Sequence, residues 1–214
     1  MRLIIMGPAG AGKGTLAQEI IKRYHLAYIA TGSMFRQEIS QKSELGLLAK
    51  TYIDSGKLVP DDVTIALVLQ RIKGEDCKLG FILDGFPRTI NQARALEETL
   101  VAQNLSIEQV ISLNIDFEEL KKRIVDRRIC SGCQRIYNLN YLPPKETNIC
   151  DDCGSDLYQR SDDTLDQLSI RIQEYEENTK EVLEFYQKAG KVIDIDASLP
   201  PHEVWLETAE KLVN

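Results

Sequence analysis

The stretch GPAGAGKGT, residues 7–15, decides the fold expected of this chain. It follows a short apolar run, RLIIM (2–6), and leads into KGTLAQEIIKRY (13–24), in which apolar residues recur at helical intervals. A glycine-rich turn between a strand and a helix points backbone N–H groups inward, and the helix N-terminus adds partial positive charge. The pattern therefore predicts a phosphate-binding loop rather than an ordinary strand-to-helix turn. The residues expected around the phosphates are Gly10, Ala11, Gly12, Lys13, Gly14 and Thr15.

Within this loop, Lys13 is expected to bridge phosphate oxygens. Gly14 stands where such loops usually carry serine or threonine. The hydroxyl that could assist Mg²⁺ is therefore displaced by one residue, to Thr15.

Short apolar runs farther along the chain alternate with longer stretches of helical period. The runs are GFILD (80–84), QVISLNI (109–115) and KVIDID, which starts at Lys191. Strands that alternate with helices predict a parallel sheet covered on both faces. The expected fold class is α/β, a three-layer α/β/α phosphate-loop domain with a parallel β-sheet, a helical insertion and a small metal-binding lid.

Two segments interrupt the alternation. The first, from about Thr31 to Lys73, is predicted to form several short helices with a turn at GKLVPDD. The second, from Cys130 to Tyr158, has little periodicity and is too long for a plain loop. We expect a core of residues 1–29, 60–128 and 161–214, a helical insertion of residues 30–59, and a lid of residues 129–160, called the cysteine unit below.

The charge balance excludes one class of function. The 214 residues hold 26 Lys and Arg against 33 Asp and Glu, a net charge of -7. Proteins that coat nucleic acid nonspecifically need a basic surface, so we expect no nucleic-acid partner and an anion site that is built locally. The start, MRLIIMGPAG, lacks the features of a signal peptide, and no run approaches about 20 apolar residues. We expect a soluble, cytoplasmic protein with no membrane partner.

Asp84 and Arg88 are candidate site residues at and after the end of the apolar run GFILD. Asp84 ends FILD, so it should lie at the carboxyl edge of the sheet, where open parallel sheets bind ligands. It is a candidate for holding Mg²⁺ through water, and a plain turn is the alternative. Arg88 follows in DGFPR, and a guanidinium near a phosphate site is a bidentate anion ligand.

Four more arginines flank the cysteine unit. Arg123 and Arg127 are spaced i to i+4 and are expected on one helix face. Arg171 lies eleven residues after Arg160, close to three helical turns, which predicts a shared face again. A solvated surface arginine is the alternative for each. Together these arginines offer charge to both sides of one cleft, as phosphoryl transfer requires.

The cysteine unit carries two CxxC pairs with sixteen residues between them. Two such turns typically present four thiolates to one structural zinc ion. Iron, a redox pair and free thiols are the alternatives. The predicted ligands are Cys130, Cys133, Cys150 and Cys153, whereas Cys77 is expected to be a small, partly buried residue.

The motifs together resemble those of the adenylate kinase family of nucleoside monophosphate kinases, in its long-lid form, over essentially the whole chain. The matching segments are GPAGAGKGT, TGSMFR, GKLVPDDV, GFILDGFPRT with Gln92, RIVDRR, the CxxC pairs and RSDDTLDQLSIR. The resemblance implies a monomer that binds ATP, AMP and ADP. It also implies reversible, Mg²⁺-dependent transfer, ATP + AMP = 2 ADP, directly and in line.

The resemblance also implies residue roles. Arg123 would pack over the ATP adenine, and Asp162 and Asp163 would serve the lid's closing contacts or its hinge. ATP contacts would include Arg123 and Arg127. AMP contacts would be Thr31, Arg36, Lys57, Leu58, Val59, Gly85, Arg88, Gln92, Arg160 and Arg171. The catalytic set would be Lys13, Asp84, Arg88, Arg123, Arg127, Arg160 and Arg171.

Some of these roles have structural alternatives. Thr31 could merely cap its helix, and T89-I-N-Q92 fits a capping box in which Gln92 reaches back to the backbone. The chain also departs from the family pattern, because Pro8 is followed by Ala9 and because TGS puts Ser33 where the family usually has aspartate.

Three other functions remain as alternatives. The nearest is a kinase for UMP, CMP or GMP. A second is an ATPase with a zinc-ribbon module, although residues 130–160 carry three basic and four acidic residues, a poor balance for a phosphate backbone. A GTPase is the third, but no NKxD-like segment occurs.

Overall fold

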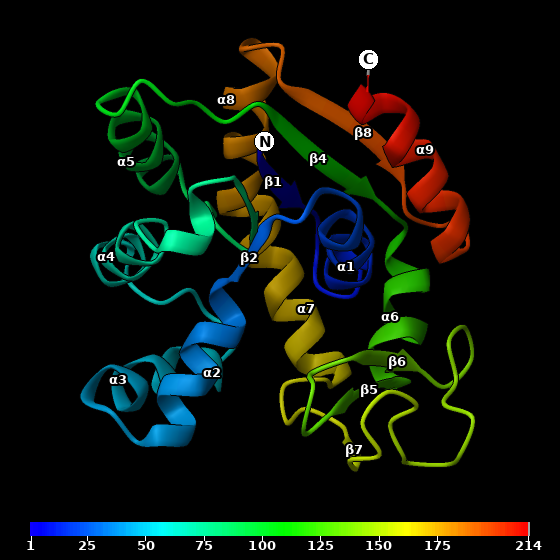
Figure 1. Cartoon of the computed structure of the whole chain (residues 1–214). Helices are drawn as coiled ribbons and strands as arrows, with labels where there is room; N and C mark the ends of the chain where they lie inside the picture. Colours follow the sequence, from blue (N-terminus) through cyan, green and yellow to red (C-terminus); the bar gives the residue numbers. More distant parts are fainter. Residues whose placement is uncertain (214) are drawn as a thin grey trace.

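A five-stranded parallel sheet forms the centre of the computed structural model, which describes residues 1–213 (Figure 1). The strand order is β2-β3-β1-β4-β8, and every neighbouring pair is parallel. The strands are β1 (Arg2–Met6), β2 (Ala27–Ala30), β3 (Phe81–Asp84), β4 (Gln109–Asn114) and β8 (Val192–Asp196). The α/β fold class is confirmed. Strand β2 was not expected, because its four residues are too few to show a period of two.

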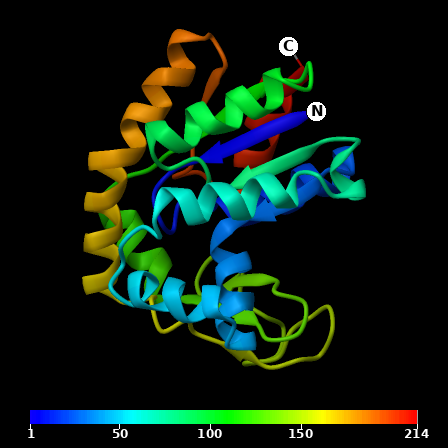
Figure 2. The same cartoon turned by 90° about the vertical axis from the view of Figure 1, so that its left-hand side faces the viewer.

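Helices cover both faces of this sheet. Leu3 and Ile5 of β1 pack in one buried cluster with α1 and α9, whereas Ile4 and Met6 pack in a second cluster with α4, α5 and α8. Helices α4 and α5 run side by side over this second face (Figure 2). The helices are α1 (Lys13–Tyr24), α4 (Asp61–Arg71), α5 (Ile90–Val101), α6 (Phe117–Val125), α7 (Leu165–Glu174), α8 (Lys180–Lys188) and α9 (Pro201–Val213). A 3-10 turn, Glu75–Cys77, precedes β3, and a π-helical turn, Tyr175–Thr179, joins α7 to α8.

The helical insertion projects from the carboxyl edge of the sheet (Figure 1). It contains α2 (Thr31–Gln41) and α3 (Glu44–Ile53), as the sequence predicted. The two helices touch at Gly46, where an added Cβ would lie 2.2 Å from the carbonyl oxygen of Glu38. Phe35, Ala49 and Val59 form a small core of the insertion's own. This part therefore has its own packing, separate from the clusters on the sheet.

The cysteine unit builds a second, antiparallel sheet of order β6-β5-β7. Its strands are β5 (Arg127–Cys130), β6 (Ile136–Asn138) and β7 (Leu157–Tyr158). Tyr137 and Leu157 pack with two of the cysteines in a small buried cluster. Among residues 1–213, no helix is both long enough and apolar enough to cross a membrane.

Two expectations about helical spacing are wrong. Helix α6 ends at Val125, so Arg127 belongs to strand β5 and does not share a helix face with Arg123. Helix α7 begins at Leu165, so Arg160 precedes it and has no helical phase in common with Arg171. Arg127 and Arg160 are therefore brought toward Arg171 by tertiary structure and not by helical spacing.

Candidate active site

The glycine-rich loop encloses the side chain of Lys13. The loop follows β1 and ends at Gly12, whose φ of 92° is a left-handed conformation that glycine adopts without strain. The Lys13 ammonium donates hydrogen bonds to the carbonyl oxygens of Gly7 and Pro8, both at 2.8 Å. Both acceptors are backbone carbonyls, so the Pro8–Ala9 order does not prevent these bonds. A phosphate at this loop would meet a fixed ammonium at the N-terminus of α1.

The cysteine unit reaches over this loop. A Cβ built on Gly14 would lie 2.8 Å from Cδ1 of Ile136 in β6. A side chain at position 14 would therefore push the terminal methyl of Ile136 aside. The contact shows that the cysteine unit lies directly against the loop.

Three arginines with acidic or carbonyl partners lie near Lys13. Arg88 is buried and its Nε donates to the carbonyl oxygen of Gly85 at 2.9 Å. Arg171 pairs with Asp162 at 3.1 Å. Arg127 forms a bidentate ion pair with Asp163, whose side chain is fully buried. The three arginines come from different elements, and two of them are held by the adjacent residues Asp162 and Asp163.

Arg160 lies in the same region with an unused donor. Within residues 1–213, its Nε is buried and has no hydrogen-bond partner. Buried donors are almost always satisfied in folded proteins, and exceptions often mark a ligand site. Arg160 is thus free to bind an anion.

This cluster carries more positive than negative charge, and burial together with that charge lowers the pKa values of several of its cations. Burial, together with the charges of Arg88, Arg171 and Arg127, lowers the pKa of Lys13 to about 8, whereas Asp84 opposes the shift. Burial, with Arg36 and Arg127 nearby, lowers the pKa of Arg160 to about 9. Burial likewise lowers the pKa of Arg171 to about 10. Cations that repel one another in a buried site are stabilised when an anion binds between them.

Asp84 lies at the carboxyl end of β3, as expected, and receives a hydrogen bond that the sequence did not reveal. The hydroxyl of Tyr28 donates to Oδ2 of Asp84 at 2.7 Å. Burial and the Asp84 charge raise the pKa of Tyr28, so the phenol stays a donor. Tyr28 was missed because β2 was missed: the register of β2 on β3 pairs Ala30 with Asp84 and brings Tyr28 alongside.

A pocket opens between the helical insertion, the β3–α5 connection and α7. Every residue predicted to contact AMP lines it, except Arg160. Six further lining residues were not predicted. The lining residues are Thr31, Gly32, Phe35, Arg36, Ile53, Gly56, Lys57, Leu58, Val59, Thr64, Gly85, Arg88, Gln92, Asp162 and Arg171.

The alternative that Thr31 merely caps its helix is wrong. Gln92 does reach back to the backbone, but to the N–H of Arg88, the residue before the cap Thr89. Thr31 Oγ1 donates to the carbonyl oxygen of Gly85 at 2.9 Å and makes no cap contact. Gln92 Oε1 accepts from the backbone N–H of Arg88 at 2.8 Å, and its Nε2 donates to Asp61 at 2.7 Å. Thr89 is the residue that caps α5. Gln92 therefore fixes the backbone of Arg88 from within the pocket wall.

Arg123 bonds to the segment after β8 and lies against a tyrosine of the cysteine unit. Its guanidinium donates to the carbonyl oxygens of Ala197 at 2.7 Å and Ser198 at 3.3 Å, after β8. It also lies 5.4 Å from the ring centroid of Tyr141 in the cysteine unit. The planar group faces the space between the core and the cysteine unit rather than the loop.

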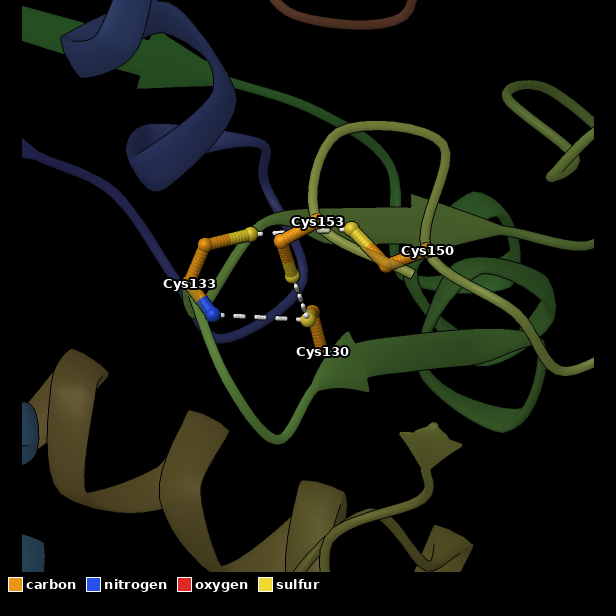
Figure 3. A group of neighbouring side chains, drawn as sticks. All are labelled: Cys130, Cys133, Cys150 and Cys153. Carbon is orange, nitrogen blue, oxygen red and sulfur yellow. Dashed lines mark hydrogen bonds between the residues drawn. The ribbon is translucent and has the colours of Figure 1, made fainter. Parts of the chain in front are cut away.

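The four cysteines of the two CxxC pairs converge on one point, shown in Figure 3. Their sulfur atoms all lie within 4.8 Å of one another. The closest pairs are Cys130–Cys153 at 3.3 Å and Cys133–Cys150 at 3.6 Å. Four sulfurs about 2.3 Å from one tetrahedral ion would be about 3.8 Å apart, so the cluster fits such an ion. The backbone N–H of Cys133 donates to the sulfur of Cys130 at 3.4 Å, which suits a thiolate.

The remaining cysteine has no place in this cluster. Cys77 is buried beside α4, and Nη1 of Arg71 donates to its sulfur at 3.1 Å. The expectation of a small, buried residue is confirmed.

Comparisons with known proteins agree with this geometry. The family model described as adenylate kinase matches residues 5–191. An adenylate kinase of Alkaliphilus oremlandii is 45% identical over 99% of this chain and 98% of its own length. Those of Archaeoglobus fulgidus and Thermosipho africanus are 46% and 47% identical, over 97% and 93% of this chain and 95% and 93% of their own lengths. With the phosphate loop, the buried cations and the neighbouring pocket in place, the chain belongs to the adenylate kinase family.

Proposed function

We propose that this adenylate kinase holds ATP on the loop of residues 7–15 and AMP in the pocket between the helical insertion and α7. The reaction is the reversible transfer of a phosphoryl group, ATP + AMP = 2 ADP. The observation that carries the assignment is the position of two arginines: Arg88 and Arg171 line the pocket, and both lie close enough to Lys13 at the loop to lower its pKa. One group of buried cations thus serves both the loop and the pocket.

The chemistry follows from positioning and charge. Lys13 would neutralise the phosphates of ATP, and Arg88 and Arg171 would orient the phosphate of AMP for in-line attack. Arg127 and Arg160 would stabilise charge on the group in transfer. Magnesium would enter as part of the MgATP substrate, and the oxygens of Asp84 and Thr15 would accept hydrogen bonds from its water ligands. No side chain needs to accept the phosphoryl group covalently.

The acceptor is tested with a panel of monophosphates. Purified protein with MgATP should phosphorylate AMP with a kcat/KM at least about 100-fold above that for UMP, CMP or GMP, because the pocket is built to bury one base. A coupled assay that follows ADP formation measures this. Equal rates with all four acceptors, or a preference for another base, would contradict the assignment of AMP.

Replacement of Lys13 tests the loop. Lys13→Met keeps the aliphatic stem and removes the ammonium, and we expect kcat to fall about 100- to 1000-fold, as when other preorganised charge donors are lost. The melting temperature should stay within a few degrees of the parent value. Lys22→Met is the matched control, because Lys22 lies on the same helix in an exposed pair with Glu19. A Lys13→Met enzyme as active as the control would exclude the loop from the reaction.

We further propose that the four cysteines hold a structural zinc ion. The four-sulfur donor set favours zinc, and the two buried and two exposed cysteines join otherwise separate turns of the cysteine unit. The ion would supply folding energy, and no chemical step depends on it. We also propose a cytoplasmic location, because free thiols persist in a reducing compartment. We propose a monomer, because the residues of both proposed nucleotide sites come from one chain.

Removal of the ligands tests the metal. The double variant with Cys130→Ser and Cys133→Ser should contain no zinc by elemental analysis, where the parent contains one ion per chain. Its melting temperature should fall by several degrees, because binding energy of the metal is folding energy. Cys77→Ala is the control and should keep the zinc. Full stability together with abolished activity in the double variant would show a catalytic metal instead.

A further inference from the structure

A side chain of α7 makes a hydrogen bond to the end of helix α3 in the helical insertion. Nε2 of Gln167 donates a hydrogen bond to the backbone carbonyl oxygen of Asp54 at 3.1 Å, across 113 residues of sequence. Asp54 is the C-cap residue of α3, where carbonyl groups lack partners within the helix. The acceptor is a carbonyl oxygen, so the amide nitrogen of Gln167 must face it. Gln167 therefore caps a helix of another part of the molecule.

The backbone on either side of this contact is closely packed. Gly56 has a φ of 73°, and a Cβ there would lie 2.7 Å from Oε1 of Gln167 and 3.1 Å from Cγ2 of Ile170. Gly56 also lines the proposed AMP pocket, as does Arg171, the residue after Ile170. The ends of α3 and α7 thus meet at one rim of the pocket (Figure 2).

Gln167 itself does not belong to the pocket lining, and its side chain is not needed to start its own helix. Thr164 caps α7 by accepting the backbone N–H of Gln167 at 3.3 Å. That bond remains when the side chain is changed. Oε1 of Gln167 is buried and has no partner within residues 1–213, so the amide is committed to the one bond with Asp54.

We propose that Gln167 is a positioning residue that clasps the helical insertion against α7 and so raises the affinity of the enzyme for AMP. The inference rests on the proposed function, which places AMP in this pocket. When the insertion moves away from α7, the bond to Asp54 is lost. The apparent affinity of a ligand scales with the fraction of protein in the competent form, so a weaker clasp raises the KM for AMP. MgATP binds at the loop on the other side and is unaffected.

The test compares Gln167→Met and Gln167→Ala with the parent enzyme. Methionine fills the same space without a donor, and alanine removes both packing and donor. Each should raise the KM for AMP, and the Kd for AMP by calorimetry, about fivefold, the factor that a neutral hydrogen bond is typically worth. The KM for MgATP and kcat should stay within twofold. Gln173→Ala is the matched control, because Gln173 lies on the same helix and, among the residues that the structure describes, its side chain bonds only to Glu177, one turn away.

Other outcomes would overturn the proposal. An unchanged KM for AMP in a folded Gln167→Met enzyme would show that the clasp has no role in acceptor binding. Equal rises in both KM values, or a loss of kcat with them, would show a general structural role. Failure of the proposed function looks different, because the parent itself would then not phosphorylate AMP. The clasp would still be tested by the KM of the monophosphate that the parent accepts.

Discussion

The structure depends on keeping several cations buried close together. Burial of like charges is unfavourable, and the lowered pKa values of Lys13, Arg160 and Arg171 reflect that cost. Asp162 and Asp163 hold Arg171 and Arg127 in ion pairs, and the charge of Asp84 offsets part of the positive charge near Lys13. On the proposed function, the phosphates of two nucleotides would match the remaining positive charge. A site of this kind binds the charge-rich transition state because its donors are already oriented.

The fold takes each cation from a different element. Lys13 begins α1 directly after the loop, Arg88 lies in the β3–α5 connection, Arg127 in β5 and Arg171 in α7. The parallel sheet brings the first two to one edge. The helical insertion and the cysteine unit then close on that edge, through the contact of Gln167 with Asp54 and that of Ile136 with Gly14.

Motifs that act through local geometry could be predicted from the sequence, and those that act through tertiary contacts could not. The loop of residues 7–15 and the two CxxC pairs have fixed spacings, so their local structure follows from the residues present. Arg127 and Arg160 were assigned to helices because spacing is the only signal that a sequence offers, yet they meet through a strand and a loop. Tyr28 lies outside every recognised motif, and Gln167 lies in RSDDTLDQLSIR at a position to which no role was assigned from the sequence. Their roles come from strand register and from a contact 113 residues away.

The central claim is that both nucleotides lie together in the cation cluster and that the phosphoryl group passes directly between them. The stereochemical course at phosphorus tests it most directly. With ATP made chiral at the γ-phosphorus, the account predicts inversion of configuration in the ADP formed from AMP, because a single in-line displacement inverts that centre. Retention would mean two displacements through a phosphorylated side chain, and would contradict the account.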